Sequence, residues 1–384
     1  MLTPSMHKRR VLFVINSLVG GGAERVLLEL IKSSQHYLRT YDISLALLDD
    51  VPRQYTPPSW LEIHQLKSRS TLIGSIKELQ RLLKVLRPDV TVSFLTRANV
   101  CCGLLGRIYG HASILSERVN TTSHLAGSSF GAFSRFLVRY TYPFAHHLIA
   151  VSDGIGDDLK ANFRVRADRL STIPNPIDAA RIVAASSQVS WAIGDAPYAV
   201  AVSRLTKNKN VILLVEAIAE SKLRLPLVIL GEGPEEEAIR TRAKELGISD
   251  LIIMLGFVDN PYPIMKGASC YISGSNAEGF PNGLVEALAL GVPVIATNCP
   301  SGPSEVLHRA RRENCAGLIA GEFGVLVPQN DAIAMAAGIK LALEPLRKAA
   351  YAQAGPVRAA DFNVGRATKG YWDIIENVLL RHKI

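Results

Sequence analysis

The sequence predicts an α/β protein made of two doubly wound domains, each built on a parallel β-sheet. Apolar runs of strand length alternate with helical patterns along the chain, which is typical of parallel sheets covered by helices. The 384 residues exceed the usual size of a single domain. Residues 179–196 follow neither a strand nor a helix period, so we expect them to link the two domains.

The first domain is expected over residues 1–178 and the second over residues 197–362, with an amphipathic C-terminal helix over residues 363–384. Ligands of doubly wound sheets bind beyond the carboxyl ends of the strands, so the loops that follow the strands are the candidate sites. Strands of the first domain are predicted at residues 11–15, 43–48, 90–94, 114–116 and 148–151, and those of the second at residues 198–202, 227–230, 252–255, 270–272, 292–296 and 324–327.

Positive charge is concentrated in the first half of the chain. Residues 1–180 hold 22 Lys and Arg against 14 Asp and Glu, whereas residues 181–384 hold 21 against 20. A basic half favours an acidic partner. No nucleic-acid-binding motif accompanies the charge, so we expect an anionic membrane surface or a phosphate-bearing substrate and no nucleic acid.

Cysteine and histidine patterns predict neither a disulfide framework nor a metal site. The five cysteines form no CxxC pair and their number is odd, which favours reduced thiols and a cytoplasmic location. There is no Asp-x-Asp and no HxxxH, and we expect no required metal or cofactor. Neither a signal peptide nor an apolar run long enough for a membrane span is expected.

Residues 278–297, EGFPNGLVEALALGVPVIAT, form the most informative segment of the chain. Glu278 and Glu286 flank a turn of small residues and the start of a helix. The free N–H groups of a helix N-terminus favour an anion such as a diphosphate, and carboxylates accept hydrogen bonds from sugar hydroxyls. The other ligand-binding residues predicted in this segment are Gly279, Phe280, Asn282, Gly283 and Leu284.

Residues 203–210, SRLTKNKN, follow a predicted strand and precede a predicted helix. Arg204 and Lys209 are two cations suited to hold an anionic group such as a diphosphate. Lys207 is expected to be a solvated surface charge.

Glycine-rich turns follow two other strands. Gly21 and Gly22 belong to the run GGGAER, in which Arg25 stands where a dinucleotide-binding fingerprint requires its third glycine. A nicotinamide-dependent dehydrogenase is therefore disfavoured. Either the amides of this turn approach a phosphate or an acceptor, or the turn only connects strand to helix. Gly231 lies in a second such turn, GEGP.

The Glu-x7-Glu segment and these turns resemble the retaining nucleotide-sugar glycosyltransferases of family 4, over residues 11 to about 330. The resemblance implies the GT-B fold, in which two Rossmann-like domains face a central cleft and the last helix crosses back to the first domain. It also implies that Glu278 faces the donor sugar, Glu286 holds the donor ribose, and Arg204 and Lys209 clamp the diphosphate. The residues implied to border the nucleotide base are Phe257 and Val258.

The resemblance implies transfer of a sugar, from a UDP-sugar rather than a GDP-sugar, to a hydroxyl of a lipid-linked glycan with retention of configuration. The reaction is expected at the cytoplasmic face of the membrane. Two alternatives remain, namely a UDP-sugar epimerase with the same layout and a non-catalytic nucleotide-sugar-binding protein. Asn210 stands where the family usually has glycine.

Acceptor-binding residues are expected in the first domain. Glu117 and Arg118 end a predicted strand and either line an acceptor site or form a structural ion pair. His124 is the nearest candidate for the histidine that many family members carry near this position. Arg135 and Arg139 lie on a helical pattern whose aromatic face is either core-facing or a contact with anionic lipid or an acceptor diphosphate.

Overall fold

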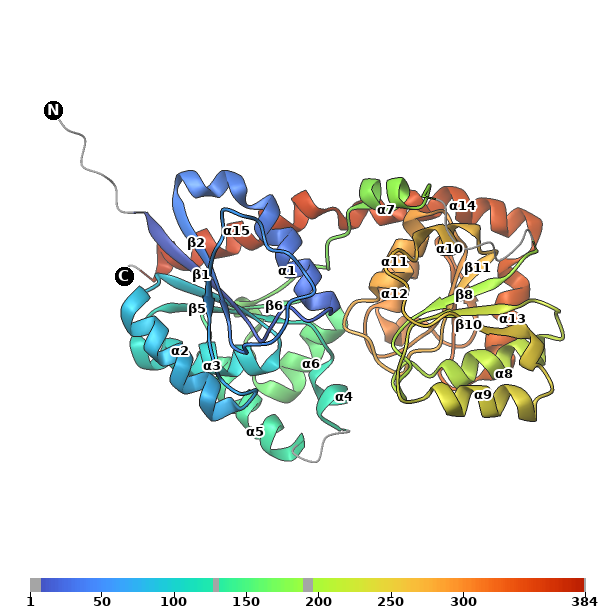
Figure 1. Cartoon of the computed structure of the whole chain (residues 1–384), viewed down its shortest axis with the longest axis horizontal. Helices are drawn as coiled ribbons and strands as arrows, with labels where there is room; N and C mark the ends of the chain where they lie inside the picture. Colours follow the sequence, from blue (N-terminus) through green and yellow to red (C-terminus); the bar gives the residue numbers. More distant parts are fainter. Residues whose placement is uncertain (1–7, 127–130, 189–195, 383–384) are drawn as a thin grey trace. The chain divides into compact units, whose positions relative to one another are not determined.

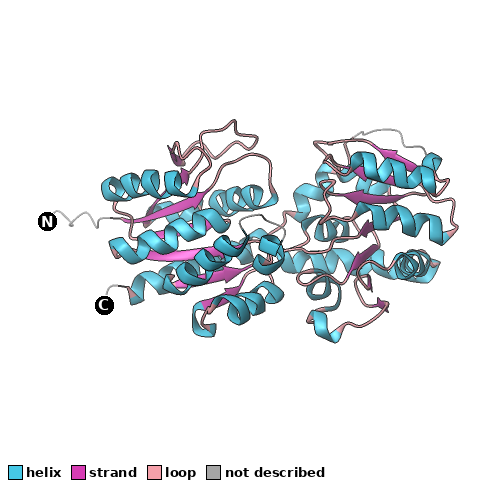
Figure 2. Ribbon diagram, turned by 90° about the horizontal axis from the view of Figure 1, so that it is seen from below, coloured by secondary structure: helices cyan, strands magenta, loops and turns pink. Residues whose placement is uncertain are grey.

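The computed structural model describes residues 8–126, 131–188 and 196–382. The chain divides into two compact units. Unit 1 comprises Met1–Pro176 and Val364–Ile384, and unit 2 comprises Ile177–Asn363. Figure 2 shows that helices cover both faces of the sheet in each unit. The predicted fold class, two doubly wound parallel-sheet domains, is confirmed.

Unit 1 contains a seven-stranded parallel sheet in the order β3-β2-β1-β4-β5-β6-β7. Its strands are β1 (Arg9–Ile15), β2 (Tyr41–Leu47), β3 (Glu62–Gln65), β4 (Val90–Phe94), β5 (Ala112–Glu117), β6 (His147–Ala150) and β7 (Leu170–Thr172). Its helices are α1 (Gly22–Ser33), α2 (Leu72–Leu86), α3 (Thr96–Tyr109), α4 (Thr121–Ala126), α5 (Gly131–Thr141), α6 (Asp153–Phe163) and α15 (Val364–Arg381), with 3-10 turns η1 (Gln35–Arg39), η2 (Tyr142–Phe144) and η3 (Ala167–Arg169).

Unit 2 contains a seven-stranded sheet in the order β10-β9-β8-β11-β12-β14-β13, in which β13 pairs antiparallel to β14. Its strands are β8 (Ala199–Val202), β9 (Leu227–Leu230), β10 (Ile252–Met254), β11 (Cys270–Ser273), β12 (Val294–Thr297), β13 (Ile319–Ala320) and β14 (Val325–Val327). Its helices are α7 (Ala179–Ala185), α8 (Val211–Ser221), α9 (Glu236–Glu245), α10 (Tyr262–Gly267), α11 (Asn282–Ala289), α12 (Pro303–His308), α13 (Ala332–Ala342) and α14 (Pro345–Ala359), with 3-10 turns η4 (Ser249–Leu251), η5 (Arg312–Asn314) and η6 (Ala360–Phe362).

The segment expected to link the domains, residues 179–196, begins with helix α7. Asp178 caps this helix, because its side chain accepts a hydrogen bond from the amide of Arg181. Residues 189–195 of the expected linker lie outside the described residues.

Helix α15 packs into the core of unit 1, although it is the last helix of the chain. Trp372 is almost completely buried, stacks on Tyr37 with ring centroids 4.0 Å apart, and donates its indole N–H to Ser34 Oγ at 2.7 Å. In Figure 1 this helix, drawn in red, lies beside the blue strands β1 and β2. Burial of large aromatic side chains therefore ties the chain end to the N-terminal sheet.

In each sheet, strand order reverses at a central pair, β1 and β4 in unit 1 and β8 and β11 in unit 2. The connections that leave the carboxyl ends of such a pair run in opposite directions and leave a crevice between them. In unit 2 the two loops at this switch point are residues 203–210 and residues 274–281, the segments that carry the predicted cationic and acidic residues.

Candidate active site

Hydrogen bonds join the two switch-point loops of unit 2. The amide of Asn276 donates to the carbonyl of Asn208 at 2.7 Å, and Asn208 Nδ2 donates to the carbonyl of Ala277 at 2.9 Å. Asn210, at the start of α8, has a φ of 46°. Asparagine tolerates this left-handed conformation better than most residues, which explains why it can occupy a position where glycine is usual.

An ion pair spans the two loops. Lys209 Nζ lies 2.5 Å from Glu278 Oε1, and the side chains are 22% and 12% exposed. Ser275 Oγ donates to the same carboxylate oxygen at 2.6 Å. The loop after β8 and the loop after β11 thus bring a cation and an acceptor of hydrogen bonds to one point.

The other basic residues of the first loop face solvent. Arg204 is exposed, and in the described ranges its side chain makes neither a hydrogen bond nor an ion pair. Lys207 is exposed as well, in keeping with its expected role as a surface charge. Arg204 is therefore available to an anion beside Lys209.

Helix α11 begins directly after the Glu278 loop and carries Glu286, which is only 5% exposed. The amides of its first turn are not equivalent. Asn282 N donates to the carbonyl of Phe280 at 3.0 Å and Leu284 N to the carbonyl of Pro281 at 3.1 Å. The amide of Gly283 has no such partner within the part of the chain that the structure describes.

Phe280 is 7% exposed and packs edge-on against Phe362, with ring centroids 5.2 Å apart. Gly279, next to it, is also buried. Ser301 Oγ, in the segment between β12 and α12, donates to the backbone carbonyl of Glu278. These contacts position the Glu278 loop.

The second glycine turn packs against the cationic loop. Gly231 has a φ of 134°, and a Cβ atom there would lie 2.0 Å from the carbonyl oxygen of Ser203. Only glycine allows this approach. Glu232 Oε1 accepts a hydrogen bond from the amide of Phe257 at 3.3 Å, and the Phe257 ring is 70% exposed. Val258, the next residue, is partly buried.

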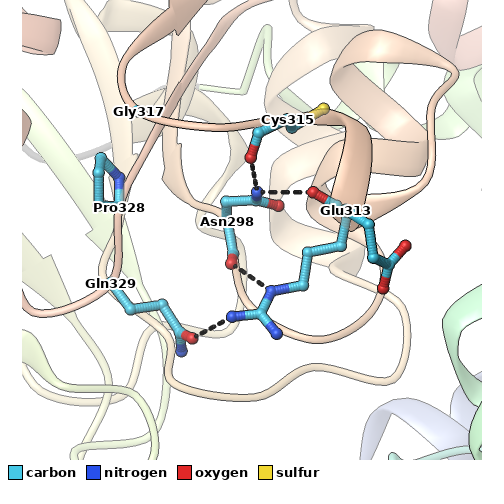
Figure 3. Close-up of a pocket in the computed structure, with 7 residues that line it drawn as sticks. Asn298, Glu313, Cys315, Gly317, Pro328 and Gln329 are labelled. Carbon is cyan, nitrogen blue, oxygen red and sulfur yellow. Dashed lines mark hydrogen bonds between the residues drawn. The ribbon is translucent and has the colours of Figure 1, made fainter.

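A pocket of about 310 Å³ lies at the carboxyl ends of β12 and β14 (Figure 3). Arg312 donates to the carbonyl of Asn298 and to Gln329 Oε1, both at 3.0 Å. Gln329 Nε2 in turn donates to the carbonyl of Asn276 at 2.7 Å, in the Glu278 loop. The residues that line the pocket are Asn298, Arg312, Glu313, Cys315, Gly317, Pro328 and Gln329.

The first glycine turn lies in unit 1, at the N-terminus of α1. Gly20 has a φ of 63°, and a Cβ atom at Gly21 would lie 2.1 Å from Glu24 Oε2. Glu24 is the acidic residue of the first helical turn. Gly22 is exposed. The turn stands at the switch point between β1 and β4, the position expected for a binding turn in a doubly wound sheet.

Glu117 and Arg118 are buried rather than exposed at a surface. Glu117 is fully buried and accepts hydrogen bonds from the Arg118 amide and the Tyr142 hydroxyl; burial raises the pKa of its carboxyl. Arg118, 7% exposed, donates to Asn175 Oδ1 at 2.6 Å and to Tyr371 OH at 3.1 Å. The structure thus places both residues in a network that joins β5 to α15, and their side chains form no ion pair with each other.

The aromatic side chains of α5 face solvent. Phe133, Phe136 and Tyr140 are 58%, 62% and 60% exposed, so the interpretation of this aromatic face as core-facing is wrong. Arg139 donates to the carbonyl of Asn162 at 2.5 Å, and Arg135 lies over the ring of Phe163. His124 lies in α4, but its side chain is outside the described residues, as is Phe130.

Two family profiles match the chain in succession. The profile described as Glycosyltransferase Family 4 matches residues 20–181, and that described as Glycosyl transferases group 1 matches residues 185–354. The chain is 30% identical over 364 residues, 91% of its length and 94% of the relative's, to the N-acetylgalactosamine-N,N'-diacetylbacillosaminyl-diphospho-undecaprenol 4-alpha-N-acetylgalactosaminyltransferase of Campylobacter jejuni.

The chain belongs to glycosyltransferase family 4. A second Campylobacter jejuni relative of this family 4 member is the GalNAc-alpha-(1->4)-GalNAc-alpha-(1->3)-diNAcBac-PP-undecaprenol alpha-1,4-N-acetyl-D-galactosaminyltransferase. It is 24% identical over 384 residues, 96% of this chain and 99% of the relative. The sequence resemblance is thus confirmed, and the protein is a glycosyltransferase.

A solved structure supports the fold of the family 4 enzyme. The HepE protein of Anabaena in complex with UDP superposes with a TM-score of 0.76 at 18% identity, covering 96% of this chain and all of the other. The predicted GT-B fold is therefore confirmed.

Within residues 8–126, 131–188 and 196–382, no group of three or more His, Cys, Asp or Glu side chains is arranged to hold a metal ion. Over the same ranges, no helix has both the length and the apolar character needed to cross a membrane. All five cysteines are free and buried.

Proposed function

We propose that this protein is a retaining, metal-independent glycosyltransferase that moves a sugar from a UDP-sugar to a hydroxyl of a lipid-linked glycan. The observation that carries the proposal is the Lys209–Glu278 ion pair at the switch point of unit 2. It places a cation suited to a diphosphate against a carboxylate suited to sugar hydroxyls.

In this proposal Arg204 and Lys209 hold the donor diphosphate. Arg204 has no competing partner in the described chain, and an incoming diphosphate replaces Glu278 as the partner of Lys209. The released Glu278 carboxylate then accepts hydrogen bonds from the donor sugar. Because two cations neutralise the leaving group, its departure requires no metal ion.

The other contacts with the sugar donor are assigned from where each residue lies in its unit. Glu286, on α11, accepts from the donor ribose, and the exposed ring of Phe257 offers an apolar face to the base. The amide of Gly283, at the α11 N-terminus, has no backbone partner among the described residues and is available to the donor. Shape and backbone contacts are assigned to Val258, Gly231, Gly279, Phe280, Asn282 and Leu284, and Gly21 and Gly22 are assigned to a phosphate of the donor or acceptor.

The proposed reaction proceeds on one face of the sugar. The bond between the anomeric carbon and the leaving phosphate oxygen breaks, and a bond from the acceptor oxygen to the same carbon forms on the same side. The acceptor hydroxyl proton passes to the leaving phosphate. No enzyme carboxylate forms a covalent intermediate, and Glu278 orients the sugar.

The donor and acceptor classes are supported by the relatives. The two Campylobacter jejuni relatives are N-acetylgalactosaminyltransferases whose named acceptors are diphospho-undecaprenol-linked sugars, and HepE binds UDP. A UDP-sugar donor and a polyprenyl-diphosphate-linked acceptor are consistent with the net positive charge of residues 1–180.

We further propose that helix α5 contacts the membrane that carries such an acceptor. Its aromatic face is defined here as Phe133, Phe136 and Tyr140, all more than half exposed. Arg135 and Arg139 on the same helix are exposed cations. Exposed aromatic rings beside arginines suit the interface of an anionic bilayer.

A donor panel tests the proposal. UDP- and GDP-sugars are incubated with the protein in EDTA, with and without a polyprenyl-diphosphate-linked glycan extract, and nucleotide release and isomerisation of the donor are both measured. Release of UDP that requires the extract is the expected result. Isomerised donor without release would instead identify an epimerase, and binding without turnover in any arm would identify a non-catalytic binding protein.

The configuration of the product is measured separately. Proton NMR of the new glycosidic linkage gives its anomeric configuration, and retention is expected. An inverted product, or activity that EDTA abolishes and a divalent cation restores, would overturn the retaining or the metal-independent part of the proposal.

A further inference from the structure

Tyr271 is a buried tyrosine of β11 that the sequence motifs do not single out. The side chain is 4% exposed, and its hydroxyl forms no hydrogen bond with any described residue, although the oxygen itself is not among the fully enclosed polar atoms. Tyr198, in the same unit, shows the usual arrangement, since its hydroxyl donates to the carbonyl of Ile264 at 2.6 Å. The Tyr271 hydroxyl therefore has no partner among the described residues and remains accessible, which leaves one donor for a ligand.

The Tyr271 hydroxyl lies beneath the first turn of α11. A Cβ atom on Gly283 would lie 2.6 Å from it, so any side chain at position 283 would occupy the same space. The amide of Gly283 also lacks a backbone partner in the described chain. Two free donors, one from a side chain and one from the backbone, therefore meet at this point of the switch-point crevice.

Two carboxylates, Glu278 and Glu286, act electrostatically on the Tyr271 hydroxyl. Glu286 follows Gly283 by three positions on α11, which places both on one face of the helix. Burial raises the pKa of Tyr271, and the charges of Glu278 and Glu286 raise it further. The phenol is thus protonated and acts as a donor.

The charges of Glu278 and Glu286 indicate which kind of ligand group the Tyr271 hydroxyl can bind. A phosphate oxygen placed between Tyr271 and two carboxylates would be repelled by them. A neutral hydroxyl accepts from the phenol and donates its own proton to a carboxylate, so it satisfies both groups. The ligand group that fits is a sugar hydroxyl, and the position of Gly283 and Glu286 on one helical face favours the ribose.

We propose that Tyr271 is a donor-recognition residue whose phenol donates a hydrogen bond to the ribose hydroxyl that Glu286 also binds. This inference rests on the proposed function, because it takes the nucleotide of a sugar donor as the ligand of the α11 N-terminus. In this proposal Tyr271 contacts the ribose from strand β11, whereas Glu286 contacts it from helix α11.

Calorimetric titration of the full chain with UDP, 2′-deoxy-UDP and 3′-deoxy-UDP tests the inference in wild type and in Tyr271→Phe. We expect Tyr271→Phe to weaken UDP binding about 3- to 10-fold, the effect of losing one hydrogen bond. For the deoxy nucleotide that lacks the recognised hydroxyl, wild type and Tyr271→Phe are expected to bind equally well. Tyr198→Phe is the matched control, and it should leave all three affinities unchanged.

The outcomes separate the two proposals. Equal UDP affinity in wild type and folded Tyr271→Phe would overturn the inference while leaving the proposed function intact. A loss that appears with the UDP-sugar but not with UDP would assign the phenol to the transferred sugar and overturn the ribose assignment. Failure of wild type to bind UDP at all would overturn the proposed UDP donor itself.

Discussion

Lys209 and Glu278 are 69 positions apart in the chain, and Lys209 Nζ lies 2.5 Å from Glu278 Oε1. The two residues meet because the parallel neighbours β8 and β11 end side by side while their connecting helices diverge. The pair is only partly exposed, so its charges interact in an environment less polar than water. The ion pair therefore brings a cation and a carboxylate to one point of the crevice.

Replacement of Lys209 is expected to impair the transferase. Lys209→Ala removes one of two cations assigned to the leaving diphosphate and should lower kcat by about 100-fold or more, the usual cost of losing one charge-stabilising group. Lys207→Ala, two residues away on the same loop and exposed, is the matched control and should retain the wild-type rate. Steady-state kinetics with the donor found in the panel measure both. Equal rates for the two variants would contradict the assignment of Lys209 to the leaving diphosphate.

Glu286 and Glu278 are expected to differ in which step they affect. Glu286→Ala should raise the Kd for UDP about 10-fold, because a buried charged acceptor of ribose hydrogen bonds is lost. Glu278→Gln should leave UDP affinity nearly unchanged and lower kcat, since Glu278 faces the sugar that UDP lacks. Calorimetry with UDP and single-turnover kinetics with the UDP-sugar separate the two effects, and unchanged UDP affinity in Glu286→Ala would contradict the ribose assignment.

Gly283 and Tyr271 are expected to be energetically coupled. In Gly283→Ala the new methyl group would lie 2.6 Å from the Tyr271 hydroxyl but 3.4 Å from the ring carbon that bears it. The substitution should therefore lower the free energy of unfolding by about 1–3 kcal/mol in wild type and by clearly less in Tyr271→Phe. Urea unfolding of the four proteins gives the coupling free energy. The same cost in both backgrounds would show that the hydroxyl is not where the structure places it.

The aromatic face of α5 is expected to control binding to anionic vesicles. Replacing Phe133, Phe136 and Tyr140 together by serine removes exposed apolar surface without opening the core, so stability should be retained. Co-sedimentation with vesicles of phosphatidylglycerol and phosphatidylethanolamine should fall at least several-fold. Leu346→Ser, an 87% exposed leucine of unit 2, is the control. Equal sedimentation of the triple variant and wild type would contradict the proposed membrane contact.

Protonation of the buried His111 is expected to lower the free energy of unfolding in mild acid. Burial and the neighbouring His146 and His382 lower the pKa of His111 to about 4 from 6.5. As the pH falls, His111 is therefore protonated in the unfolded chain before it is protonated in the folded chain. The contribution of neutral His111 to the free energy of unfolding is complete above pH 6.5 and is lost as the pH falls towards 4. Its full size is about 3 kcal/mol. Chemical unfolding between pH 7 and 4.5 should show a shallower pH dependence in His111→Asn than in wild type, and identical slopes would contradict the shift.

The sequence alone determined the central strands and the motifs at their ends. All the predicted strands are present, with ends that differ by a few residues, because a continuous apolar run is a local signal. The missed strands, β3, β7 and β13, are all sheet edges. An edge strand is short and only partly covered, as the sequence EIHQ of β3 illustrates, so it lacks the apolar run that marks a buried strand.

Only the tertiary structure shows how the residues of the candidate site are arranged. No spacing in the sequence shows that Lys209 reaches Glu278, that Arg118 is buried against Tyr371, or that α5 turns its aromatic face to solvent. Tyr271 carries no motif signal, because the role proposed for it depends on a glycine twelve residues later that leaves room for its hydroxyl. Local composition specifies strands, turns and helix ends, whereas contacts between distant segments depend on how the sheet orders its strands. The strand order of unit 2 therefore brings Lys209 and Glu278 of this glycosyltransferase together.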